Sequence, residues 1–178
     1  MASILLIFGG LPGVGKTTIA LELSRQIGTF HVRIDSIEQA MRAAGAMQGP
    51  LDEAGYRVGY AVAADNLRLG RNVIADCVNP LNITREAWVA EAAQVGAIAV
   101  NVEIVCSNVQ EHRRRVEARV ADIPELNPPT WDEVVARNYQ PWVGKRIVID
   151  TAGRSVKDTL EELRKALAAV CPQIFGND

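Results

Sequence analysis

The sequence predicts a parallel α/β sheet, and three observations lead to this prediction. A wholly apolar run at residues 4–8 is followed by a glycine-rich loop and then by a helix-compatible stretch. Four further short apolar runs alternate with helical patterns along the chain, as they do in parallel α/β domains. These runs are rich in β-branched residues, which is typical of strands buried on both faces.

The individual elements follow from these patterns. After the first strand at 4–8, the apolar runs predict strands at 31–34, 73–75, 97–105 and 146–149. Capping-box patterns predict helices that begin at Ser36, Ser107, Thr130 and Ser155. The Thr130 helix is expected to run to residue 140, and three prolines between 121 and 129 exclude a regular helix before it.

Composition indicates a soluble protein of one domain. The chain has 178 residues, of which 48% are hydrophobic and 22% are charged. No apolar run has the length of a membrane span, and the N-terminus lacks the features of a signal peptide. The three cysteines show no metal-ligand spacing, which favours reduced thiols and a cytoplasmic location. We therefore expect a single domain over 1–178 without a membrane partner, and the sequence gives no indication of its oligomeric state.

The loop after the first strand fits the pattern G-x-x-x-x-G-K-[ST], which binds the phosphates of a nucleoside triphosphate. Its glycines let successive N–H groups converge on phosphate oxygens at a helix N-terminus. The predicted nucleotide-binding residues are Gly10, Leu11, Pro12, Gly13, Val14, Gly15, Lys16, Thr17 and Thr18. In this set Lys16 would reach the β- and γ-phosphates, and the Thr17 hydroxyl would bind Mg²⁺. No [NT]-K-x-D guanine signature is present, which favours ATP.

Two aspartates follow predicted strands. Asp35 comes after the second strand and Asp76 after the third, at the sheet edge where ligands bind in open parallel sheets. Asp35 is a candidate to accept the proton of an attacking hydroxyl, or alternatively to stabilise a helix N-terminus. Asp76 is a candidate magnesium-organising carboxylate or substrate ligand. The sequence leaves open which of the two is the base; if Asp76 is the base, Asp35 would only bind the substrate.

Further polar residues are predicted near this edge. Asn79 and Arg85 follow Asp76 and are candidate substrate-binding residues; the alternative for Arg85 is an exposed arginine in the first turn of a helix. Four arginines lie on the helix after the fourth strand, whose valines 109, 116 and 120 share one face. Arg115 and Arg119 line one flank of that face, so we expect them to stabilise the transferred phosphate. Arg137 is a weaker candidate of the same kind, and no role is assigned to the two histidines.

On these residues the chain resembles the small P-loop kinases, in the branch that includes adenylylsulfate kinase, chloramphenicol phosphotransferase, zeta toxins and polynucleotide kinase. The resemblance covers Gly10–Thr17, Asp35, Asp76, 113–119 and 150–151. It implies a five-stranded parallel sheet of order 2-3-1-4-5 with helices on both faces and a mobile helical lid at about 108–142. It also implies transfer of the ATP γ-phosphate to a hydroxyl, with Asp35 as the base. Segments 76–80 and 131–142 resemble a group of bacterial predicted kinases.

One departure concerns the acceptor. Polynucleotide kinases have an arginine three residues after the position of Asp35, whereas this chain has Glu38, which would repel a phosphate. The formal net charge of −2 also gives no general attraction to nucleic acid. The primary hypothesis is therefore a Mg²⁺·ATP-dependent phosphotransferase acting on a small-molecule hydroxyl. The alternatives are a 5′-hydroxyl nucleic-acid kinase and a non-catalytic ATP-binding regulatory module.

Overall fold

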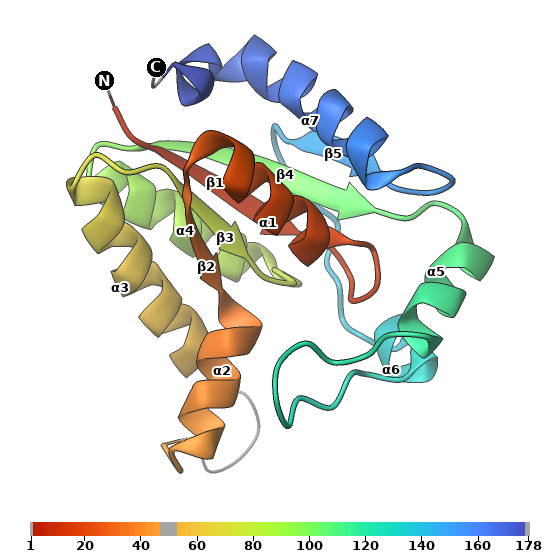
Figure 1. Cartoon of the computed structure of the whole chain (residues 1–178). Coiled ribbons are helices and arrows are strands. Elements are labelled where there is room, and N and C mark those ends of the chain that lie inside the picture. Colours follow the sequence, from red (N-terminus) through yellow and green to blue (C-terminus); the bar gives the residue numbers. More distant parts are fainter. Residues whose placement is uncertain (1, 47–52, 177–178) are drawn as a thin grey trace.

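The sheet is parallel and five-stranded, as predicted. The computed structural model describes residues 2–46 and 53–176 (Figure 1). Its strand order is β2-β3-β1-β4-β5, so β1 lies at the centre, and all four strand pairs are parallel. The strands are β1 (Ile4–Gly9), β2 (Phe30–Arg33), β3 (Val73–Asp76), β4 (Ile98–Val105) and β5 (Ile147–Asp150). Each predicted strand therefore exists, with ends that differ by one residue at most.

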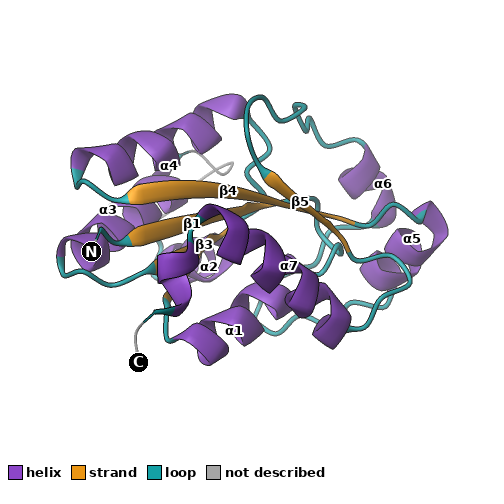
Figure 2. Ribbon diagram, turned by 90° about the horizontal axis from the view of Figure 1, so that it is seen from above, coloured by secondary structure: helices purple, strands orange, loops and turns teal. Residues whose placement is uncertain are grey.

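Helices cover both faces of the sheet (Figure 2). One face carries α1 (Lys16–Ile27) and α7 (Val156–Val170), and the other carries α3 (Ala54–Arg68) and α4 (Asn82–Gln94). The remaining elements are α2 (Ile34–Ala43), α5 (Val109–Glu117), α6 (Trp131–Val135) and the short 3₁₀ helix η1 (Pro172–Phe175). No helix in the described part of the chain is long and apolar enough to cross a membrane.

The hydrophobic core consists of two clusters, one on each face of the sheet, and alternate side chains of β1 belong to each of them. Ile4, Leu6 and Phe8 pack with α1 and α7, whereas Leu5 and Ile7 pack with α3 and α4. Successive side chains of a strand point to opposite faces, so a central strand with a helical layer on each side must be apolar throughout. This burial fixes the position of β1 and therefore of the loop that leaves its carboxyl end.

Two of the four predicted helix starts are confirmed. The hydroxyls of Thr130 and Ser155 accept hydrogen bonds from the third residue of α6 and α7. The helix expected to begin at Ser36 begins instead at Ile34, directly after β2, so Asp35 lies in its first turn. The arginine-rich helix is capped by Asn108 rather than Ser107, because the Asn108 side chain accepts from Glu111 N at 3.0 Å.

Two expectations about the lid segment are wrong. The helix at 130–140 is only the short α6, because residues 136–146 follow the body of the protein as an irregular chain. The three valines of the α5 segment do not form one packed face: Val116 is buried, but Val109 and Val120 are exposed. Helical periodicity cannot be extended to Val120, since α5 ends at Glu117.

The irregular chain after α6 is held by a buried arginine. Arg85 of α4 is 4% exposed, and its guanidinium donates to the carbonyls of Asn79, Pro80, Gln140 and Pro141. It also lies over the rings of Tyr139 and Trp142. Arg85 therefore ties the loop after β3 to the segment that leads into β5.

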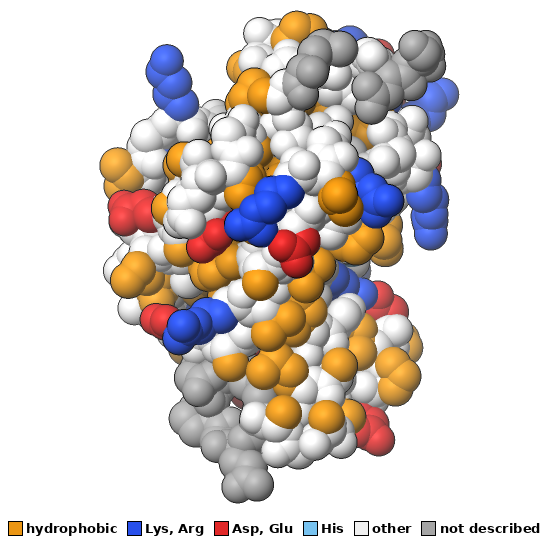
Figure 3. Space-filling model, turned by 90° about the vertical axis from the view of Figure 1, so that its left-hand side faces the viewer, with side chains coloured by type: hydrophobic (Ala, Val, Ile, Leu, Met, Phe, Trp, Pro, Cys, Tyr) orange, Lys and Arg blue, Asp and Glu red, His pale blue; other side chains and the backbone are white. Residues whose placement is uncertain are grey.

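Both signs of charge are interspersed with apolar side chains on the face that carries α2 and α3 (Figure 3). Among the described residues, no field of a single sign covers this face. The small net charge of the sequence is therefore not the result of two large opposing patches here.

Replacing Arg85 by lysine should destabilise the protein by about 2 kcal/mol or more, because an ammonium cannot reach all of these buried carbonyls. Urea unfolding followed by circular dichroism measures the free energy of unfolding. The matched control is Arg68→Lys, an exposed residue paired with Asp65, which should cost less than about 0.5 kcal/mol. Equal losses in the two variants would contradict the assigned role of Arg85.

Candidate active site

The glycine-rich loop joins β1 to α1 at the carboxyl edge of the sheet. Gly10, Gly13 and Gly15 have φ angles of +145°, +86° and +95°, which favour glycine. A Cβ atom on Gly13 would lie 2.5 Å from Cγ2 of Val116 in α5, so the absence of a side chain lets α5 approach the loop. The loop is therefore curled tightly, with a helix N-terminus behind it, as a phosphate site requires.

Lys16 is the first residue of α1, and its side chain is buried at the base of the loop. Burial lowers the pKa of its ammonium below the ordinary value, and the carboxylates of Asp76 and Asp35 offset part of this shift. Its Nζ donates to the Leu11 carbonyl at 3.3 Å. A buried ammonium with so few partners suits an anionic ligand such as a triphosphate.

Asp76 ends β3 and is 3% exposed. Burial raises its pKa, but a hydrogen bond from His31 and the charge of Lys16 outweigh burial, so the carboxyl pKa lies below its ordinary value. His31 Nε2 donates to Asp76 Oδ2 at 3.2 Å. A hydrogen bond from the Thr17 hydroxyl also lowers this pKa. Asp76 is thus kept ionised beside the two residues predicted to bind phosphate and magnesium.

The hydroxyl of Thr17 and the carboxylate of Asp76 are oxygen donors of the kind that Mg²⁺ prefers, and nucleotide phosphates and water would supply the rest. Among residues 2–46 and 53–176 no group of three or more His, Cys, Asp and Glu side chains could hold a metal by itself. The residues present therefore fit a magnesium ion that arrives with a nucleotide, and they do not form a closed metal site.

Asp35 lies in the first turn of α2, opposite the lid segment. Its carboxylate is 4.0 Å from Nη2 of Arg119, which follows the end of α5. Next to it, Arg33 donates two hydrogen bonds to Asp122, at 2.5 and 2.9 Å, and holds the pKa of Asp122 down to about 2. Two ion pairs therefore join the end of β2 and the first turn of α2 to the segment after α5.

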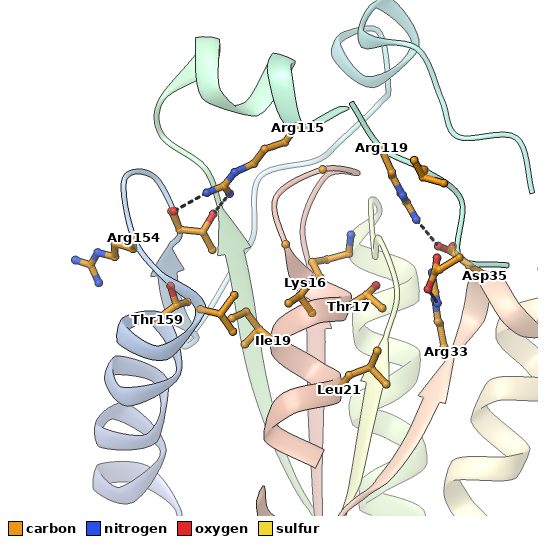
Figure 4. Close-up of a pocket in the computed structure, with 17 residues that line it drawn as sticks. Lys16, Thr17, Ile19, Leu21, Arg33, Asp35, Arg115, Arg119, Arg154 and Thr159 are labelled. Carbon is orange, nitrogen blue, oxygen red and sulfur yellow. Dashed lines mark hydrogen bonds and ion pairs between the residues drawn. The ribbon is translucent and has the colours of Figure 1, made fainter. Parts of the chain in front are cut away.

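The other end of the lid is held through Thr151, directly after β5. Arg115 of α5 donates to the Thr151 hydroxyl at 2.7 Å and to its carbonyl at 3.0 Å. The Thr151 hydroxyl in turn donates to the carbonyl of Val14 in the phosphate loop, at 2.9 Å. In Figure 4, Arg115 and Arg119 reach down from the lid on either side of Lys16 and Thr17.

Two cavities meet at this edge of the sheet. The first, of about 540 Å³, contains the end of the phosphate loop, Thr17 and Arg115. The second, of about 560 Å³, lies between α2, α3, the loop after β3 and the segment at 126–137. Three residues line both cavities: Lys16, Asp35 and Arg119. The junction thus brings together three of the four predicted catalytic residues, and the fourth, Arg115, lines the first cavity.

Asn79 and Arg85 lie outside these cavities. Asn79 is fully buried, with a φ angle of +49°, and its side-chain amide donates to the Phe8 carbonyl at 2.8 Å. The donors of Arg85 are directed at chain carbonyls, and the residue is not the exposed first-turn arginine of the alternative interpretation. A direct role in binding the substrate has no support in this geometry, because neither side chain faces the junction.

Several residues of the site were not found from the sequence. His31 orients Asp76, and His112 of α5 donates from Nε2 to the Pro12 carbonyl at 2.8 Å while its ring meets Trp131 edge to face. Both histidines act through residues distant in sequence, so no local pattern marks them. Thr151 enters the sequence analysis only as part of the segment 150–151 that the family resemblance covers.

The comparisons with known proteins agree with this architecture. The AAA domain family (AAA_33) matches residues 5–141, and no curated protein shows significant similarity to the chain. APS kinase CysC of Mycobacterium tuberculosis in complex with AMPPNP and APS has a similar structure, with a TM-score of 0.69 and 17% identity over 93% of this chain and 98% of that chain.

Two further solved structures share the fold. The gluconokinase of Sinorhizobium meliloti 1021 gives a TM-score of 0.66 with 13% identity over 99% of this chain and 97% of that chain. A sugar kinase of Janibacter sp. HTCC2649 gives 0.65 with 15% identity over 98% of both chains. The family match runs from β1 to the segment after α6 and includes the phosphate loop. The chain therefore belongs to the AAA domain family of P-loop proteins.

Proposed function

We propose that the protein is a Mg²⁺·ATP-dependent phosphotransferase that moves the γ-phosphate to a hydroxyl of a small-molecule acceptor. The observation that carries this proposal is the junction of the two cavities at Lys16, Asp35 and Arg119. A kinase must hold two substrates end to end, with the transferred group between them. Two cavities of similar size that share a cation, a carboxylate and a second cation fit this requirement.

Each shared residue has a defined task. The acceptor hydroxyl gives its proton to the Asp35 carboxylate while its oxygen forms a bond to the γ-phosphorus, and the bond from that phosphorus to the β-phosphate oxygen breaks, leaving ADP. Lys16 and Arg119 stabilise the negative charge on the transferred group and the leaving oxygen. A magnesium ion held by Thr17 and Asp76 would neutralise further phosphate charge. Asp35 is favoured over Asp76 as the base because Asp35 faces both cavities.

The solved structures with the same fold support this reaction class. Their names describe an APS kinase bound to AMPPNP and APS, a gluconokinase and a sugar kinase. These acceptors are small molecules, and the second cavity of this chain has a volume of about 560 Å³, which suits an acceptor of similar size.

The base assignment predicts that Asp35→Asn lowers kcat by about a hundredfold or more and leaves the affinity for ATP within about threefold. An ADP-release assay against a library of hydroxylated metabolites, sugars and antibiotics supplies the acceptor, and calorimetry with a non-hydrolysable ATP analogue measures nucleotide binding. Asp65→Asn, an exposed change on α3, is the control.

A kcat that survives in Asp35→Asn but collapses in Asp76→Asn would transfer the role of base to Asp76. ATP binding without ADP release from any acceptor would overturn the proposed kinase activity and favour a non-catalytic module.

The packing of α5 on the phosphate loop gives a second prediction. Gly13→Ala should weaken ATP binding more than tenfold, because the new methyl group would collide with Val116 and displace the lid from the loop. Gly70→Ala is a matched control, since Gly70 has a similar φ angle of +77° but no atom within 4 Å of the new methyl. Both variants carry the same backbone strain, so equal ATP affinities in calorimetry would contradict the role of the contact.

A further inference from the structure

Glu38 lines the second cavity one helical turn after Asp35. Residues three apart on a helix share a face, so both carboxylates of α2 point to the same side. Gly55 of α3 makes room for Glu38, because a Cβ atom at that position would overlap the Glu38 side chain. The half-buried Glu38 side chain thus occupies space that α3 leaves open by having a glycine there.

Glu38 has no protein partner in the described part of the chain: no hydrogen bond reaches its carboxylate, and no cation lies within 4.0 Å. Burial and the neighbouring Asp35 charge raise its pKa to about 7, against the more distant guanidinium groups of Arg42 and Arg137. Glu53, directly before α3, and Tyr56 in its first turn face the same cavity. A half-buried carboxylate without a partner is unfavourable for folding, which is the signature of a group kept for a ligand.

We propose that Glu38 determines the acceptor by accepting a hydrogen bond from a hydroxyl or amine that neighbours the hydroxyl being phosphorylated. The acceptor is then a polyol or an amino alcohol. A phosphate, sulfate or carboxylate at that neighbouring position is rejected by like charge. This inference rests on the proposed kinase activity and adds the substrate class to it.

The spacing along α2 supports this orientation. At 1.5 Å per residue, Glu38 lies about 4.5 Å along the helix axis from Asp35, and Arg42 about 10.5 Å from it. The spacing of about 4.5 Å between Asp35 and Glu38 suits a small acceptor that carries two hydrogen-bond donors on neighbouring carbon atoms. Arg42 is exposed and lies beyond Glu38, so it can meet an acidic group only at the far end of the acceptor, and Arg137 lines the same cavity from the segment after α6.

The test compares acceptors that differ at one group. ADP release is measured with two series of acceptors alongside the metabolite library. The first series is glucose, glucosamine, gluconate and glucose 6-phosphate, and the second is glycerol, serinol and glycerol phosphate. We expect the best acceptors of the wild type to carry a neutral hydroxyl or an amine beside the reacting hydroxyl.

Glu38→Gln should raise the acceptor KM at least tenfold and change the ATP KM less than twofold. Glu38→Arg should shift the preference toward acidic acceptors.

Glu86→Gln is the control, because Glu86 is exposed on α4 and faces neither cavity of the site. A best acceptor with an acidic group beside the reacting hydroxyl would overturn the inference, and so would an unchanged acceptor KM in Glu38→Gln. In both cases ADP release that still depends on Asp35 leaves the proposed kinase activity standing. Absence of ADP release with every acceptor would overturn both.

A stability measurement tests the environment of Glu38 without any acceptor. Its folded pKa of about 7 lies above the ordinary 4.5, so the native state binds the proton more tightly than the unfolded chain does. Wild-type stability should therefore fall as the pH rises from 4.5 through 7, and Glu38→Gln should not share this fall. Thermal melts should show a higher Tm for Glu38→Gln at pH 8 and no gain at pH 4.5. An equal difference at both pH values would show that Glu38 is not desolvated.

Discussion

A buried positive charge is the constraint on which the site depends. The Lys16 ammonium lies under the phosphate loop, and loss of hydration disfavours its charged form. Asp76 on β3 and Asp35 on α2 restore part of the lost stabilisation from two neighbouring elements. The order of the strands, with β3 between β2 and β1, places both carboxylates within reach of a lysine that follows β1. The negative charge of a bound triphosphate would supply the rest of the stabilisation that the Lys16 ammonium loses on burial.

The same edge of the sheet also determines where the lid lies. Thr151 receives a hydrogen bond from Arg115 and donates one to Val14, so its hydroxyl joins α5 to the phosphate loop through the end of β5. His112 makes a second connection, to Pro12. Any displacement of α5 must break bonds to the backbone of the phosphate loop. The position of the lid and the shape of the loop are therefore physically coupled.

Features that depend on a local sequence pattern could be predicted from the sequence alone. Buried strands are apolar, and a phosphate loop has fixed spacing, so both were predicted to within a residue. The environment of Arg85 could not be predicted, because the carbonyls of residues 140 and 141 come from a chain segment more than fifty residues away. The start of α2 was missed for a similar reason: β2 continues directly into the helix, and Arg33 at the boundary is held by the distant Asp122 rather than by a local cap.

That early start of α2 gives its two carboxylates different chemistry. Asp35 falls in the first turn, where the helix N-terminus and Arg119 place positive potential beside it. Glu38 falls one turn later, beside that negative charge and against the backbone of α3, where burial and the charge of Asp35 raise its pKa to about 7. The two acids lie on one face of the helix but have different neighbours, which suits them to separate roles. In the proposed reaction Asp35 accepts a proton during transfer, and Glu38 hydrogen-bonds a group that is not transferred.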